Sequence, residues 1–305
     1  MKLRINNIME ATILYGNGLN LLSQPKKTWT KLLKELFKKY GNDLIPDHKP
    51  YPMVYEELFL RNVLLKLKDE KDVKNEVIKF VAQNKVNEFY KMLSEFGLKN
   101  YLTTNYDFTL EEQFKTEGYE WKYNGKENKY SVFTYMEIEG TDTKVWHIHG
   151  NAVKVNTIQL GFDQYCAATR KVIAYTIGEL EFENQKIRTI IDKLKDYQFD
   201  TLSWIELFFT TDIHIIGLSM DYSETDLWWL LERRARYIKW KSVNRNKIYY
   251  YDILSKDSKS KEQLMTAFGV EYIPFKNENK KDWSNVYKTI FERLKTNIKE
   301  RESVM

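Results

Sequence analysis

Short apolar runs that stop abruptly in small or polar residues recur along this chain. Four of them lie at residues 13–20, 102–107, 145–150 and 213–219, and each ends in glycine, asparagine, aspartate, histidine or serine. In an open parallel sheet, ligands bind in the crevice at the carboxyl ends of the strands. The four runs together therefore predict one shared pocket at the carboxyl edge of a parallel sheet.

The runs alternate with stretches that have the period of an amphipathic helix, as in residues 28–36, where apolar side chains recur every three or four positions. Strands are predicted at residues 11–15, 98–104, 145–149, 213–218, 247–253 and 270–275, helices at 28–36, 54–96, 164–207, 226–237 and 282–299, a loop at 41–53, and a hairpin or irregular β segment within 119–144. Strands that alternate with helices are typical of parallel sheets. We predict an α/β fold, a Rossmann-like parallel sheet with helices on both faces and a helical insertion.

The length of the chain, 305 residues, is enough for one large domain or one and a half. No internal repeat or low-complexity linker divides it. We therefore expect a single domain over residues 1–305 with helical insertions at about 54–96 and 164–207. The second insertion interrupts the predicted sheet and could form a cover over the pocket.

Charge and cysteine content limit which partners, metal sites and cellular compartments fit this chain. The net charge is +5, from 48 basic and 43 acidic residues, and no concentrated basic stripe marks a nucleic-acid binder. The single cysteine, Cys166, allows no intrachain disulfide and no thiolate-rich zinc site. No apolar run is long enough for a signal peptide or a membrane span. We expect a cytoplasmic protein without membrane contact and without nucleic acid as a direct ligand.

The first run ends in a glycine turn. Gly16 and Gly18 follow a predicted strand and precede a predicted helix, the context in which a close backbone and a helix N-terminus bind a pyrophosphate. Asn20 lies where a side-chain amide could contact phosphate or ribose. The third glycine of the dinucleotide-binding motif is missing, so an ordinary strand-terminating turn is the alternative.

The second and fourth runs supply further polar groups. Asn105 could hold a water molecule or a ribose hydroxyl, and Asp107 could accept a hydrogen bond from a carboxamide or shape its loop. Gly217, Ser219 and Asp226 follow the fourth run, and the serine and the aspartate could face an adenosine ribose. Asparagine, aspartate and serine also form turns and cap helices, so a structural role is the alternative for each.

His147 and His149 are two of the four histidines of the chain. Two positions apart in a regular strand, they are predicted to point to the same face. Only His149, next to Gly150, lies at the carboxyl end of the strand, where it would reach the crevice. Because histidine titrates near neutral pH, we predict that His149 is the base of the pocket and that His147 is a packed structural residue.

The order of these motifs resembles that of the sirtuin-like (silent information regulator-like) family. Sirtuins carry a Gly-Ala-Gly turn, then Thr-Gln-Asn-Ile-Asp, then His-Gly, then Gly-Thr-Ser. The matching segments here are residues 16–18, 103–107, 149–150 and 217–219, so the resemblance spans roughly residues 10 to 275. The Gly-x-Pro-Asp-Phe-Arg loop of sirtuins has no counterpart after Asn20, and the four-cysteine zinc ribbon of the protein deacylases is absent.

The acylated-lysine tunnel of sirtuins is built between the sheet and the zinc module, so the sequence looks closer to the bacterial sirtuin-like NADases of antiphage defence. In that branch the motif asparagine and histidine are the catalytic pair, here Asn105 and His149. The resemblance implies an NAD+ glycohydrolase that depletes NAD when phage is sensed, with NAD as substrate and no metal. An enzyme of this kind must be held inactive until needed, so we expect a homo-oligomer and an activating partner protein or trigger.

In this interpretation Gly16, Gly18 and Asn20 would bind the pyrophosphate. Two other classes of function remain open. One is sirtuin-type deacylation or ADP-ribosyl transfer, and the other is a non-catalytic sensor module that binds NAD or ADP-ribose. The missing zinc cysteines count against the first, and the presence of both Asn105 and His149 counts against the second.

Overall fold

A computed structural model describes residues 10–23, 28–40, 49–64, 69–125, 129–196, 198–241, 246–277 and 282–303 of the chain. Most of the loop predicted at 41–53, and the N-terminal stretch that bears on a signal peptide, lie outside the described residues. No helix among the described residues combines the length and the apolar character that crossing a membrane requires.

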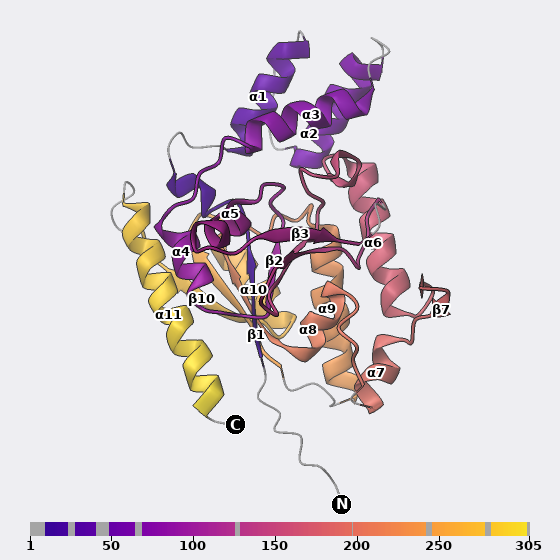
Figure 1. Ribbon diagram of the computed structural model, residues 1–305, viewed down its shortest axis with the longest axis vertical. Coiled ribbons are helices and arrows are strands. Elements are labelled where there is room, and N and C mark those ends of the chain that lie inside the picture. Colours follow the sequence, from indigo (N-terminus) through magenta and orange to yellow (C-terminus); the bar gives the residue numbers. More distant parts are fainter. Residues whose placement is uncertain are drawn as a thin grey trace, which may run out of the picture.

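Strands and helices alternate along most of the chain (Figure 1). The strands are β1 (Ala11–Tyr15), β2 (Asn100–Thr103), β3 (Trp121–Asn124), β4 (Tyr135–Ile138), β5 (Lys144–His147), β6 (Glu181–Phe182), β7 (Gln185–Lys186), β8 (Asp212–Ile216), β9 (Ile248–Ile253) and β10 (Glu271–Phe275). The α-helices are α1 (Trp29–Tyr40), α2 (Tyr51–Leu58), α3 (Glu70–Val81), α4 (Glu88–Ser94), α5 (Thr109–Thr116), α6 (Phe162–Thr176), α7 (Ile190–Asp196), α8 (Trp204–Thr210), α9 (Thr225–Lys241), α10 (Ser258–Ala267) and α11 (Trp283–Ser303). Short 3₁₀ helices lie at Asn20–Leu22 and Val155–Thr157, and a π-helix at Phe59–Leu64 continues α2.

The central sheet has eight described strands in the order β10-β9-β8-β1-β2-β5-β4-β3. The six strands from β10 to β5 run parallel, and β4 and β3 add an antiparallel hairpin at one edge. From β1 the chain builds one half of the sheet through β2, and it later returns to the other side of β1 with β8. The boundary between β1 and β8 is therefore the topological switch point, where ligands bind in sheets of this type.

Helices cover both faces of this sheet. On one face α4, α5 and α11 pack against a core that includes Ile13 and Tyr101, and on the other α6, α8 and α9 pack against a core that includes Leu14 and Leu102. The central strands are buried on both faces, which explains why they are continuous apolar runs in the sequence. The predicted α/β, Rossmann-like fold with helices on both faces is confirmed.

A third core lies beyond the carboxyl ends of the strands. It is formed by α1, α2 and α3, which stand at the top of the molecule in Figure 1 and which we call the roof helices. Tyr106, Ile158 and Leu160 connect this core to the loops at the end of the sheet. The aspartate side chain of Asp69 caps α3 by accepting a hydrogen bond from the Lys71 amide at 3.0 Å.

Residues 164–207 were predicted to form one helical insertion, but the structure differs from this prediction. The segment contains most of α6, then the small β6–β7 hairpin, then α7 and the start of α8. Glu183 and Asn184 turn the hairpin with φ angles of 51° and 63°, a left-handed conformation that helical periodicity does not reveal. The roof helices, rather than this segment, stand over the ends of the strands.

Candidate functional site

A cavity of about 560 Å³ opens at the carboxyl ends of the strands, beneath the roof helices. This volume lies within the range of roughly 300–1,000 Å³ that is usual for small-molecule sites. Many of the polar residues that line it lie after β1, β2 and β8 or at the end of β9, and these are Asn17, Thr104, Asn105, Asp107, Ser219, Asp221, Ser223, Glu224 and Asp252. Three of the four predicted runs therefore meet at this cavity, whereas the run at 145–150 stays behind its lining.

The glycine turn after β1 joins the two loops at the switch point. The Gly16 amide donates to the Ile216 carbonyl at 3.1 Å, and the Gly18 amide donates to the Gly217 carbonyl at 2.8 Å. A Cβ atom on Gly18 would lie 2.3 Å from the hydroxyl of Tyr287 and 2.7 Å from the Gly217 carbonyl, so only glycine fits there. The close approach that the sequence indicated is thus between two segments of the chain itself.

This geometry leaves no free amide at Gly16 or Gly18 for the predicted pyrophosphate site. The amides of Gly16 and Gly18 already donate to backbone carbonyls, and the helix that follows them is only the three-residue turn Asn20–Leu22. Free amides at a long helix N-terminus are what such a site requires. Gly18 and Gly217 do line the cavity, but Gly16 is not among the lining residues.

Asn20 and Asp107 hold the floor of the site together. The Asn20 Nδ2 donates to Asp107 Oδ2 at 2.9 Å, and its Oδ1 accepts from the Tyr90 hydroxyl at 2.5 Å. Asp107 also accepts from Asn84 Nδ2 at 2.9 Å and from the Thr109 amide at 3.1 Å, at the start of α5. Both side chains are occupied by bonds within the protein, so the geometry gives Asn20 and Asp107 positioning roles.

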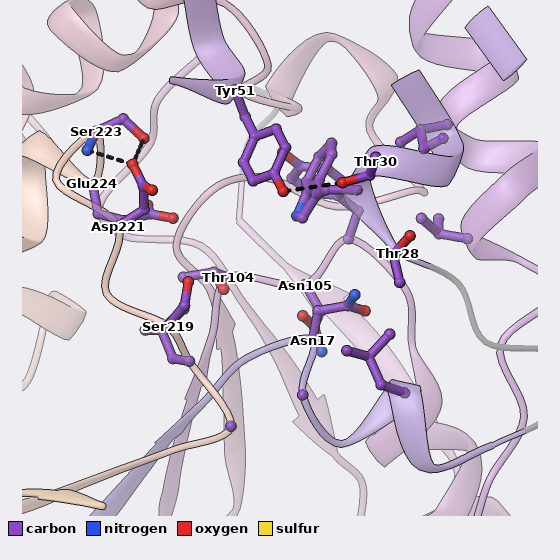
Figure 2. A pocket seen from close by; sticks show the side chains of 18 of the residues that line it. Asn17, Thr28, Thr30, Tyr51, Thr104, Asn105, Ser219, Asp221, Ser223 and Glu224 are labelled. Atoms are coloured by element: carbon purple, nitrogen blue, oxygen red, sulfur yellow. Dashed lines mark hydrogen bonds between the residues drawn. The ribbon is translucent and has the colours of Figure 1, made fainter. Parts of the chain in front are cut away.

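Asn105 differs from these neighbours because its side chain is not fully bonded. Its residue is 7% exposed, and its Nδ2 atom has no hydrogen-bond acceptor in the part of the chain that the structure describes. The side chain lies in the cavity near Asn17 and Thr28 (Figure 2). A buried donor without an acceptor costs about 1–3 kcal/mol, so this amide is suited to bind a ligand or water oxygen.

His147 fixes the backbone of that asparagine. Its Nδ1 lies 2.8 Å from the Asn105 carbonyl oxygen, and its Nε2 lies 2.8 Å from the carboxylate of Glu111, a buried residue of α5. Burial disfavours the charged ring, but the Glu111 carboxylate outweighs it and raises the pKa of His147 above its usual value. His147 is thus a packed residue, as expected, and it also sets the position of Asn105.

His149 lies in the opposite layer from His147, against α6 and α9. β5 ends at His147, two residues before the predicted end, so strand alternation no longer applies and the two rings do not share a face. The His149 Nε2 is 3.1 Å from Asp226 Oδ2, and its Nδ1 is 3.5 Å from Glu224 Oε2. The ring packs edge-on against Tyr165 with centroids 5.2 Å apart. His149 is only 1% exposed and is not among the residues that line the cavity.

The charge state of His149 follows from these two acids. Burial disfavours the charged ring, but the carboxylates of Asp226 and Glu224 outweigh it and raise the pKa of His149 to about 9. The ring is therefore held as an imidazolium at neutral pH, with Nε2 donating to Asp226 and Nδ1 facing Glu224 as an ion pair at 3.5 Å. A ring in that state has no lone pair with which to accept a proton.

Glu224 is a candidate site residue that the sequence analysis did not single out. It lies two positions before Asp226 at the start of α9, where an acidic residue is also explained by the helix dipole. The residue lines the cavity, with 15% of its side chain exposed, and its buried Oε2 makes no hydrogen bond with the described residues. Burial raises the pKa of Glu224 to about 7, helped by Asp226 and Asp221 and opposed by His149. The signal that could have found it is the spacing of acids in residues 221–226.

Of the two residues predicted to contact a ribose, Ser219 and Asp226, one lines the cavity and the other does not. Ser219 lines the cavity, and its carbonyl accepts hydrogen bonds from Tyr250 and Lys261. Asp226 does not face the cavity, because its Oδ2 atom is turned to His149 and its Oδ1 accepts from the Leu227 amide at 2.9 Å. Its position corrects the predicted ribose role to that of a partner for the histidine.

His149, Glu224 and Asp226 also combine residue types that bind metal ions, and one potential ligand atom from each lies within 4.8 Å of the others. The two ring nitrogens of His149, however, face different carboxylates. In the described geometry each ring nitrogen is thus paired with its own carboxylate, and the three groups are not turned toward one common point. The arrangement therefore suits a shared proton better than a metal.

Aromatic side chains complete the cavity. Trp29 and Tyr51 of the roof helices stack with ring centroids 6.4 Å apart, and Tyr106, after β2, and Tyr165, of α6, also line the cavity. Gln159, which is buried, contributes an Oε1 atom that accepts no hydrogen bond from the described residues. A cavity with aromatic walls and a few unpaired polar atoms is suited to a ligand with planar rings and hydroxyl or amide groups.

No model of a known protein family matches the chain, and no curated protein sequence matches it either.

Proposed function

We propose that the protein is an NAD+ glycohydrolase, which cleaves the nicotinamide–ribose bond and releases nicotinamide and ADP-ribose. The order of the motifs and their resemblance to sirtuin-like NADases support this assignment. A cavity at the switch point of a Rossmann-like sheet supports it as well. We further propose that the enzyme serves bacterial antiphage defence by depleting NAD.

The observation that carries the proposal is the amide nitrogen of Asn105, which has no acceptor among the described residues, in a cavity that Glu224 also lines. In the view of Figure 2, the two residues lie on different sides of the cavity, with Thr104 and Ser219 between them. A donor and an acid on different sides of one cavity can contact two parts of the same bound substrate. Asn105 would donate to a ribose hydroxyl, and an acid would take the proton of the attacking water.

The charge of the lining fits the chemistry of this bond. Nicotinamide is cationic while attached and leaves as a neutral molecule, so no acid is needed to protonate it. The ribose becomes oxocarbenium-like in the transition state, and nearby carboxylates stabilise that positive charge. Among the described lining residues, the acids are Asp107, Asp221, Glu224 and Asp252, and Lys261 is the one basic side chain. Lys261 is therefore the charged group that a pyrophosphate would meet.

The direct test is incubation of the purified protein with NAD, with and without an acyl-lysine peptide. We expect nicotinamide and ADP-ribose in equal amounts without the peptide. Nicotinamide that forms only with the peptide, together with an acylated ADP-ribose, would instead indicate a deacylase. Tight binding of NAD that gives no product under any condition would indicate a sensor module.

A further inference from the structure

We propose that Glu224 is the general base of this site and that His149 acts through it as a positioning residue. The inference rests on the proposed NAD+ hydrolysis and names the group that takes the proton. It departs from the sequence-based expectation, in which His149 itself is the base.

Glu224 and His149 differ in whether a ligand in the cavity can contact them. Glu224 is one of the residues that line the cavity, with 15% of its side chain exposed, whereas His149 is 1% exposed and is not among the lining residues. The His149 Nδ1 reaches only to Glu224 Oε2 at 3.5 Å, and its Nε2 is turned to Asp226 Oδ2 at 3.1 Å. A substrate or water in the cavity therefore meets Glu224, and the imidazole has no nitrogen directed at it.

The two residues also differ in protonation state at neutral pH, because different charged groups surround them. An imidazole with a carboxylate at each nitrogen is held as an imidazolium, which is an acid and not a base. The groups that face Glu224 come from several elements, namely His149 after β5, Asp221 and Asp226 around the start of α9, Tyr165 of α6 and Tyr106 after β2. The nearby acids and burial raise the pKa of Glu224 while the imidazolium lowers it, and the balance of about 7 suits a general base at neutral pH.

The proposed step balances without another reactant. The bond between C1′ of the ribose and the pyridinium nitrogen breaks, and its electron pair stays on nitrogen, which gives neutral nicotinamide. The oxygen of a water molecule forms a bond to C1′, and one proton of that water passes to the Glu224 carboxylate. Glu224 then releases the proton to solvent, so the net products are nicotinamide, ADP-ribose and one proton. His149 stays protonated throughout, with Asp226 holding its far nitrogen.

The test compares Glu224→Gln with Asp163→Asn, an acid-to-amide control at an exposed position of α6 outside the lining. Glu224→Gln keeps the size of the side chain but cannot accept a proton. We expect it to lower kcat for nicotinamide release by ~10²–10⁴-fold with little change in the Kd for NAD, and Asp163→Asn to match the wild type. A Glu224→Gln enzyme within a few-fold of the wild-type kcat would overturn the proposal while leaving the NADase assignment intact.

The pH dependence of kcat/KM provides a second test, because a residue with a purely structural role would not shift it. In the wild type, kcat/KM should rise with pH through about 7 as Glu224 ionises. Because the imidazolium lowers the pKa of Glu224, His149→Asn should move this rise to higher pH without abolishing it. A His149 variant that has lost the rise, with an unchanged profile in Glu224→Gln, would return the role of base to His149.

The protonation state of His149 can also be measured without any enzyme turnover, by NMR of protein labelled with ¹⁵N-histidine. The chain has four histidines, so the His149 signals are assigned by their loss in His149→Asn. NMR of the wild type should show both ring nitrogens of His149 protonated at neutral pH, and Glu224→Gln should lower its pKa by removing one of the two carboxylates. A ring that is neutral at neutral pH in the wild type would overturn the proposal, even if the sample cleaves no NAD.

Discussion

At the residue scale, two buried asparagines near the cavity differ in what their side chains bond. Asn105 Nδ2 has no acceptor among the described residues, whereas Asn20 donates to Asp107 and accepts from Tyr90. Asn105→Ala should therefore lower nicotinamide release by ~10²–10³-fold, as loss of a positioned donor does, with little change in stability. Asn20→Ala should instead lower the free energy of unfolding by about 1–3 kcal/mol, because its partners lose their hydrogen bonds.

Urea unfolding and single-turnover assays on both variants measure this contrast. The roles assigned to the two asparagines would be wrong if Asn105→Ala unfolded at much lower urea than the wild type while folded molecules kept full activity.

His147 provides a second prediction at this scale, one of stability. His147→Ala leaves the buried Glu111 carboxylate without its partner, and breaking a buried pair in this way costs about 3–5 kcal/mol. The folded-state pKa of His147 is raised, so the charged pair stabilises the fold fully below the unfolded pKa of about 6.5 and less as pH rises through the folded value.

The stability difference between wild type and His147→Ala should thus be largest in mildly acidic buffer and shrink in alkaline buffer. Urea denaturation over a range of pH measures it. A difference that grows with pH would mean that Glu111 and the ring do not form the charged pair described here.

At the scale of elements, the glycine turn after β1 controls the contact between the two halves of the sheet. Gly18→Ala places a Cβ atom 2.3 Å from the Tyr287 hydroxyl and 2.7 Å from the Gly217 carbonyl, so the loop after β1 must move away from the loop after β8. We expect a less stable protein that binds NAD weakly. Adding Tyr287→Phe removes the clash with the hydroxyl but not those with Gly217, and it should restore part of the stability, as differential scanning calorimetry would show. Full tolerance of Gly18→Ala would contradict the contact.

The strands were the elements most accurately predicted from the sequence. β1 has the predicted bounds, and β2, β5, β8, β9 and β10 lie within one or two residues of theirs. In β1, β2, β8 and β9 this follows from their burial, because strands buried on both faces are continuous apolar runs. The residues 164–207 were harder to predict, since their helical periodicity passes over the β6–β7 hairpin without a break. The roof helices were recognised as helical but not placed, because placement depends on contacts with distant loops.

The site was predicted in position more than in detail. Asn105 and Ser219 line the cavity as their place after parallel strands indicated. His149 and Asp226 were grouped with them, but they turn toward each other behind the lining, since strand position does not specify side-chain direction once the strand has ended. Glu224 could not be separated by sequence from an ordinary helix-start acid.

At the scale of the whole molecule, control of the activity remains a prediction. The cavity lies between the sheet and the roof helices, so a movement of these helices would change access to it. We expect a homo-oligomer whose NAD cleavage is weak alone and rises with a partner protein or trigger. Light scattering combined with an activity assay tests this. A monomer that is fully active without any added factor would contradict it.

The absence of a metal requirement is a prediction at the same scale. The proposed step needs no Lewis acid, and the His149 nitrogens face two different carboxylates. We therefore expect nicotinamide release to survive treatment with EDTA. Metal analysis that finds a stoichiometric ion, lost in His149→Asn together with activity, would show instead that the three residues form a metal site.

The central claim, that the cavity cleaves NAD, is tested most directly by measuring nicotinamide release from NAD by the wild type and by Asn105→Ala prepared in parallel. The account predicts that the wild type releases nicotinamide and that Asn105→Ala, folded and still binding NAD, releases it at least ~10²-fold more slowly. Equal rates in the two proteins, or NAD that stays intact with the wild type under every triggering condition, would contradict the account.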